Sequence, residues 1–180
     1  MQYAKLKNDI LTARERRDEE LQKLLATLAG GSIIQLALNV PGCDKRPAGS
    51  EALFGWGQEQ LCNALAPSLE LFDVDALGPW VLYASAGDPV DVKMQCCRIE
   101  DYRDFARLLD FDVYAADGTV YDRQRLGLPQ RSCLVCAAPA RECIRTRRHT
   151  PMQVKERFEE LLEPFTTAGV GRVAYRRAQG

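Results

Sequence analysis

Apolar and polar residues alternate most regularly in the segment Leu109–Tyr114, whose odd positions are apolar and whose even positions are polar. A period of two residues is typical of a strand buried on one face. Asp117 and Gly118 follow, and both residue types tolerate the positive φ of a tight hairpin turn. The pattern therefore predicts a strand and a hairpin, with the carboxylates of Asp110 and Asp112 on one face, about 6–7 Å apart.

A longer period, typical of an amphipathic helix, covers residues from about Asp9 to Leu28 and ends at Gly30-Gly31. Arg14 and Arg17 fall on the same face as the apolar residues of this helix. Guanidinium groups in that position must reach past the apolar stripe to water, pair with acidic residues, or bind a ligand anion. The sequence leaves these three alternatives open.

Elsewhere the pattern predicts further strands and helices. The strands are Ser32–Val40, Pro79–Ala86 and Val90–Cys97, and the helices are Ser50–Leu65, a short one near Ile99–Leu108, and a last one from Pro151 to Gly169 or Gly171. The chain shows no internal repeat or low-complexity linker. We therefore expect an α/β (α+β) fold, a single domain over residues 1–180 with a mixed central sheet flanked by helices.

Composition narrows the classes of function. The 180 residues are 46% hydrophobic and 27% charged, with a formal net charge of −1, which is not the basic balance of a general nucleic-acid binder. No apolar run approaches 18 residues and the start of the chain lacks an apolar signal core, so we expect no membrane partner. Seven cysteines, an odd number, favour reduced thiols and a cytoplasmic location.

The Asp110 and Asp112 pair has two interpretations. It can be a solvated strand face before a turn, or two ligands for one Mg²⁺, a cation that takes carboxylates together with phosphate oxygens and water. Lys45, Arg131 and Arg145 could clamp phosphate oxygens, although each alone is more often a solvated charge. Their coincidence with the acidic strand is what indicates phosphate chemistry.

A second group of residues has the spacing C-x₂-C-x₆-C-x₅-H, formed by Cys133, Cys136, Cys143 and His149. Three thiolates and an imidazole are a recognised tetrahedral zinc set. The same spacing also suits one face of a helix with thiols packed as small hydrophobic groups, and that alternative is favoured because buried free cysteines are common. His149, the only histidine, could instead serve as a general base or a phosphate contact.

In their order along the chain these motifs resemble those of the apo-citrate lyase phosphoribosyl-dephospho-CoA transferases, also called citrate lyase holo-acyl-carrier-protein synthases. The matching residues are Arg14, Arg17, Pro41-Gly42, Lys45, Glu100, Arg107–Val113, Leu128–Cys136, Cys143, Arg145 and His149. The resemblance spans about residues 10–165. The chain departs from the usual His-Pro-Leu-Gly-Arg run of that family, with Arg103 and Ala106 in place of its His and Gly.

This resemblance implies an enzyme, a nucleotidyltransferase, and a nucleotidyltransferase-like form of the fold. The donor would be 2′-(5″-triphosphoribosyl)-3′-dephospho-CoA, the acceptor a serine of the acyl carrier (gamma) subunit of citrate lyase, and the leaving group diphosphate. It further implies metal-binding and substrate-binding roles for particular residues. Asp110 and Asp112 would hold Mg²⁺, with Glu100 as a weaker third candidate and Arg107 beside them, and the substrate would contact Arg14, Arg17, Lys45, Arg131, Arg145 and His149.

Two other functions fit the same residues. One is the same transfer to another carrier, such as that of malonate decarboxylase. The other is a non-catalytic adaptor built on zinc bound by Cys133, Cys136, Cys143 and His149. Assays with both apo carriers separate the first alternative, whereas metal analysis together with an Asp110→Asn activity assay separates the second.

Overall fold

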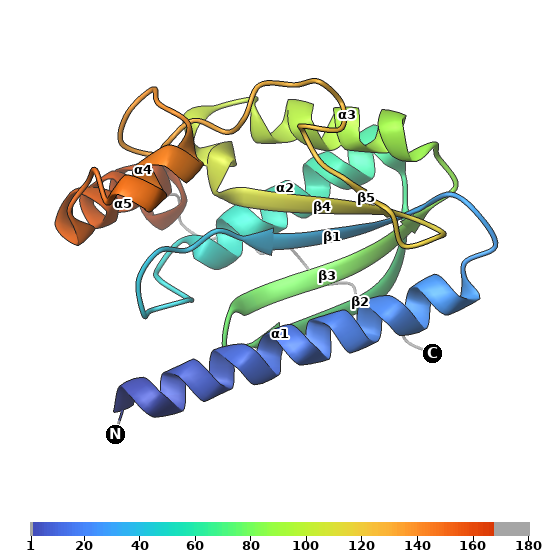
Figure 1. Cartoon of the computed structure of the whole chain (residues 1–180), viewed down its shortest axis with the longest axis horizontal. Helices are drawn as coiled ribbons and strands as arrows, with labels where there is room; N and C mark the ends of the chain where they lie inside the picture. The colour runs from blue at the N-terminus through green and yellow to red at the C-terminus, as the bar shows by residue number, and fades with distance from the viewer. Residues whose placement is uncertain (1, 168–180) are drawn as a thin grey trace.

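The computed structural model describes residues 2–167, which form one α+β domain (Figure 1). Its strands are β1 (Ser32–Leu38), β2 (Ser68–Asp75), β3 (Gly78–Ser85), β4 (Leu109–Ala115) and β5 (Val120–Tyr121). Its helices are α1 (Gln2–Thr27), α2 (Ser50–Leu65), α3 (Pro89–Glu100), α4 (Ala140–Thr146) and α5 (Pro151–Thr167), with a 3-10 turn at Asp104–Leu108. No helix in this part of the chain is long and apolar enough to cross a membrane.

The five strands form one sheet in the order β2-β3-β1-β4-β5, and every neighbouring pair is antiparallel. The expected mixed sheet is therefore wrong. The units β1-α2-β2 and β3-α3-β4 each cross over one intervening strand, so strands that run in the same direction are not neighbours. This is the split βαβ arrangement of a β-α-β-β-α-β fold.

The two faces of the sheet are covered unequally. The main core lies between one face and α2, α3 and α5, and it includes the side chains of Phe111 and Val113 from β4. On the opposite face, Leu21 and Leu25 of α1 pack on residues of β1 and β3. In Figure 1, α1 runs alongside β2 and lies farther from β4. Tyr114 of β4 also packs against this cluster, so α1 covers part of the polar face of β4.

Several predicted elements are confirmed, including the helix Ser50–Leu65 and the strand that begins at Leu109. The predicted strand Val90–Cys97 is wrong, because these residues lie in α3. Asp88 caps this helix by accepting a hydrogen bond from the backbone N–H of Val90, and Pro89 occupies the first turn. The predicted end of the last helix, Gly169 or Gly171, lies outside the described residues.

Candidate active site

Asp110 and Asp112 project from the face of β4 opposite the main core, as the alternating pattern predicts. Asp112 is paired with Gln35 of β1 and Asp110 with Ala37, so these four side chains share one face. Asp112 is half-buried, and the side chain of Asp110 is 45% exposed.

The environment of Asp112 disfavours its ionised form. Burial, followed by the charge of Asp110, raises the pKa of Asp112 to about 6. Burial also raises the pKa of Tyr114 on the same face to about 12, and the nearby carboxylates of Asp112, Asp110 and Asp18 add to the shift. The face of β4 thus concentrates negative charge, and a bound cation would relieve that repulsion.

Along the outer edge of β4, side chains form hydrogen bonds with backbone groups that have no neighbouring strand, because β5 pairs only with Val113 and Tyr114. Glu100 accepts the backbone N–H of Phe111 at 3.1 Å, and Lys93 donates to the Phe111 carbonyl. Arg131 donates to the carbonyl of Leu109 at 3.1 Å. These contacts fix the backbone on either side of Asp110.

Arg131 connects the buried and exposed acids. Its Nη2 donates to Oε1 of the buried Glu100 and lies 3.0 Å from Oδ1 of Asp110. The other carboxylate oxygen of Glu100 pairs with Arg123 at 2.9 Å. With both oxygens already paired and the side chain 2% exposed, Glu100 anchors Arg131 and is not placed to act as the third metal ligand.

A cavity of about 1610 Å³ adjoins this cluster. Its walls come from the connection after β1, the segment around the 3-10 turn, the loop that carries Arg131, and residues of α4 and α5. Figure 1 shows these segments gathered at one end of the sheet. Arg107 lines the cavity and donates to the carbonyls of Ser132 and Cys133, at 2.8 and 2.6 Å, so it also holds the Arg131 loop. Arg103 lines the same cavity, whereas Ala106 is fully buried in the core.

The residues to which the family resemblance assigns metal or substrate binding lie in two neighbouring regions. Arg107, Arg131 and His149 line the cavity, whereas Asp110, Asp112 and Lys45 do not belong to its walls. Arg131 joins the two regions, because the same guanidinium lines the cavity and contacts Asp110. The candidate site therefore consists of a carboxylate face next to a cavity.

Lys45 and Arg14 lie near one another, as a shared role in binding anions requires. The Lys45 ammonium donates to the Val40 carbonyl at 2.6 Å, three residues along the chain from Ala37, the partner of Asp110. Burial lowers the pKa of Lys45, and the charge of Arg14 lowers it further against the opposing effect of Cys43. Within residues 2–167, neither cation forms an ion pair with a carboxylate. Both groups are thus available to an anionic ligand.

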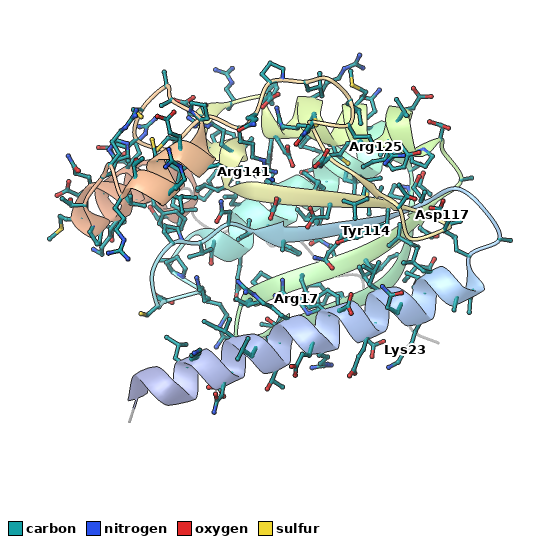
Figure 2. All side chains as sticks on the ribbon, in the orientation of Figure 1. Arg17, Lys23, Tyr114, Asp117, Arg125 and Arg141 are labelled. Carbon is teal, nitrogen blue, oxygen red and sulfur yellow. The ribbon has the colours of Figure 1, made fainter. Side chains whose placement is uncertain are left out.

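Two of the arginines predicted to bind substrate have other positions. Arg17 is buried, makes a bidentate pair with Asp75 in which both distances are 2.7 Å, donates to the Gly78 carbonyl and lies over the Trp80 ring. Figure 2 labels Arg17 between α1 and the sheet. Its role is structural, so the prediction that it faces the ligand is wrong. Arg145 is exposed on α4 and is not part of the cavity wall.

The three cysteines and His149 converge, but not on one helical face. Only Cys143 lies in a helix, while Cys133 and Cys136 lie in the preceding loop. The helix-face interpretation is therefore wrong. The four ligand atoms nevertheless lie within 4.8 Å of one another. A backbone hydrogen bond from Ala138, with a further contribution from His149, lowers the pKa of Cys136 to about 6.

Sequence reasoning missed Lys93 and Arg123. Lys93 was placed in a strand, where its contact with the Phe111 carbonyl of β4 could not be foreseen. Arg123 follows the hairpin with no motif around it, yet it pairs with Glu100 and with Asp101 at 2.8 Å. The one available signal is that the buried Glu100 requires cationic partners.

Comparison with known proteins identifies the family. The sequence profile of the family described as "Apo-citrate lyase phosphoribosyl-dephospho-CoA transferase" matches residues 6–165. The chain belongs to this family. It is 28% identical over 141 residues to a Vibrio cholerae protein named "Probable apo-citrate lyase phosphoribosyl-dephospho-CoA transferase", covering 74% of this chain and 79% of that one.

Two further relatives carry the name of the family. A Streptococcus pyogenes protein with the same printed name as the Vibrio protein is 27% identical over 164 residues, or 88% of this chain and 85% of the relative. An Escherichia coli protein named "Apo-citrate lyase phosphoribosyl-dephospho-CoA transferase" is 32% identical over 97 residues, which are 54% of this chain and 53% of the relative. The chain is therefore a member of a transferase family that acts on apo-citrate lyase.

Proposed function

We propose that this protein transfers the phosphoribosyl-dephospho-CoA group from 2′-(5″-triphosphoribosyl)-3′-dephospho-CoA to a serine of the citrate lyase acyl carrier subunit. The observation that carries the proposal is the pair Asp110 and Asp112 on one strand face beside a large cavity. Arg131, which forms an ion pair with Asp110, lines that cavity. The transfer is that of a cytoplasmic nucleotidyltransferase. The family described above is the second support.

The donor set fits Mg²⁺. Asp110 and Asp112 offer carboxylate oxygens on one face, and burial, followed by the charge of Asp110, raises the pKa of Asp112 even though Lys93 and Arg131 oppose the shift. These two residues would hold the ion, which when bound neutralises charge on the phosphates and polarises them towards attack. Arg131, bonded to Asp110, would bind a neighbouring phosphate oxygen with the part of its guanidinium that faces the cavity.

The long donor matches the two regions of the site. The cavity of about 1610 Å³ exceeds the usual size of a site for a small ligand and would take the dephospho-CoA portion. The triphosphate would then lie on the carboxylate face, with Lys45 and Arg14 as further cations. In the transfer, the serine oxygen forms a bond to the α-phosphorus, the bond from that phosphorus to the bridging oxygen breaks, diphosphate leaves, and the serine proton passes to solvent.

The direct test is the mass of the carrier. Apo citrate lyase carrier subunit is incubated with the protein, the triphosphoribosyl donor and Mg²⁺, and its intact mass is measured together with released diphosphate. We expect a gain equal to the phosphoribosyl-dephospho-CoA group and one diphosphate per carrier. The apo carrier of malonate decarboxylase, tested in parallel, shows whether the acceptor is different. No mass gain on either carrier, with folded protein and intact donor, would refute the proposed activity.

A further inference from the structure

The cluster of Cys133, Cys136, Cys143 and His149 takes no chemical step in the transfer described above, although three of its members line the cavity. It brings four donor atoms together. The Sγ atoms of Cys136 and Cys143 are 3.6 Å apart, and Nε2 of His149 is 3.3 Å from Sγ of Cys136. All four donor atoms lie within 4.8 Å of one another. Around a tetrahedral zinc, with bonds of about 2.3 Å to sulfur and about 2.0 Å to nitrogen, two sulfur ligands are about 3.8 Å apart and a sulfur and a nitrogen are about 3.5 Å apart.

The backbone builds this convergence by specific turns. The Cys133 N–H donates to the Ala138 carbonyl at 2.7 Å, and an isolated bridge joins Ser132 to Pro139, so residues 132–139 form a closed loop. Pro139 then caps α4 and sets the position of Cys143, one turn into the helix. The chain reverses after α4 because Arg147 adopts the left-handed conformation, with φ of 48°. That reversal returns His149 to the loop.

Burial and charge also suit a metal. Cys133 and Cys143 are 8% and 5% exposed, and the imidazole of the only histidine points its Nε2 at a sulfur. Thiols packed as small hydrophobic groups would not require an imidazole at this place. Three thiolates around Zn²⁺ leave one net negative charge, and the guanidinium of Arg148 contacts Cys136 where it can offset that charge.

We propose that Cys133, Cys136, Cys143 and His149 bind one structural zinc ion, which joins the Arg131 loop to α4 and to the start of α5. All four coordination positions are filled by protein, as in zinc sites that stabilise a fold. The same loop is also held by Arg107, which donates to Ser132 and Cys133, and by the Ala140 N–H, which donates to the Arg131 carbonyl at 2.9 Å. With Nε2 bound to zinc, His149 is not available as a general base.

The test measures the metal directly. The untagged protein is purified without chelator and its zinc content is measured, followed by X-ray absorption of the bound metal and by the visible spectrum after replacement with Co²⁺. We expect one zinc per chain, three sulfur ligands at about 2.3 Å and one nitrogen at about 2.0–2.1 Å. The Co²⁺ protein should show the intense visible bands of a tetrahedral thiolate site.

Variants make the assignment specific. Cys143→Ser and His149→Ala should each lose zinc or hold it at least about tenfold more weakly, whereas Cys62→Ser, an exposed cysteine on α2, should retain one equivalent. Removal of zinc should also make the loop around Ser132 more accessible to protease. If Cys143→Ser does not fold, loading the apo wild type with Co²⁺ still tests the ligand set.

Two results would overturn the zinc site. One is a folded wild-type protein that holds well under one tenth of an equivalent of zinc and binds no Co²⁺ at the thiols. The other is a disulfide between Cys136 and Cys143 in protein kept under reducing conditions. The zinc measurements concern metal content and coordination, so they are independent of the transfer assay. The zinc proposal can be refuted although the carrier gains mass, and the proposed transfer can be refuted although zinc is bound.

Discussion

Replacing Asp112 by Asn should stabilise the fold and abolish transfer. Burial and the charge of Asp110 raise the pKa of Asp112 from 3.8 to about 6. This difference corresponds to about 3 kcal/mol of unfavourable free energy for the ionised carboxylate in the folded protein, as an order of magnitude. Asn keeps the size of the side chain and removes the charge, so we expect the free energy of unfolding at pH 8 to rise by about 1–3 kcal/mol.

The pH dependence follows from the direction of the shift. Because the folded-state pKa lies above the unfolded value, the fold favours the protonated acid, and the cost of ionisation is absent below about pH 4. That cost grows between about pH 4 and pH 6 and is constant at higher pH. The stability advantage of Asp112→Asn over the wild type should therefore appear over this interval. At limiting Mg²⁺, transfer by the wild type should rise over the same interval, because the ionised carboxylate binds the cation.

Urea denaturation in EDTA and in Mg²⁺ measures the free energy of unfolding, and the mass of the carrier measures transfer. Mg²⁺ should stabilise the wild type and leave Asp112→Asn unchanged, since only the wild type offers both carboxylates. Transfer should fall at least about 10²-fold, because charge stabilisation by a metal is worth several kcal/mol. Asp117→Asn, in the exposed hairpin turn that Figure 2 labels, is the matched control and should transfer normally. Near-normal turnover of Asp112→Asn at saturating Mg²⁺, or lower stability than the wild type at pH 8, would refute the reasoning.

Two further predictions distinguish an arginine that stabilises the fold from one that acts in the transfer. Arg17→Ala should lower the free energy of unfolding by about 3–5 kcal/mol, because it leaves the buried Asp75 carboxylate without its partner. The kcat of the variant, measured below its melting range, should stay near the wild-type value, and a selective loss of donor binding would contradict the structural role. Arg131→Ala should lower kcat/KM by about 10²-fold, because it removes the cation between Asp110 and the cavity. Arg131→Lys should restore only part of the rate, since lysine lacks the planar guanidinium that reaches Glu100 and Asp110 together. Full recovery would indicate that only the positive charge is needed.

The main features of the sheet could be predicted where one face is buried and the other is polar. The alternation in Leu109–Tyr114 correctly placed both carboxylates on one face, because a strand has no other way to separate apolar from polar residues. β2 was missed, since most of its residues are exposed and a bulge between Leu69 and Leu71 interrupts the two-residue period. The residues Val90–Cys97 form a helix instead of the predicted strand because Asp88-Pro89 starts a helix and is not a turn between two strands, a signal that the sequence contains.

The candidate site could be predicted only in part, because its charges are assigned by tertiary contacts. Arg14 and Arg17 are three residues apart on one helix, yet one lies near Lys45 and the other is buried against Asp75. No spacing rule distinguishes these outcomes, since each depends on which acids the sheet brings beneath the helix. The cysteines illustrate the reverse case, in which the spacing was informative although the local structure inferred from it was wrong.

The short β5 explains why the acidic strand lies beside cations at all. β5 covers two residues, so the backbone of β4 from Leu109 to Phe111 has no strand partner on that side. A longer β5 would satisfy those groups with backbone hydrogen bonds and would exclude Arg131 from the Leu109 carbonyl, and with it from Asp110. The early end of the ladder instead leaves the edge to Glu100, Lys93 and Arg131. The position of Arg131 between the carboxylates and the cavity therefore follows from where the sheet stops, and lengthening β5 would remove that connection without changing either aspartate.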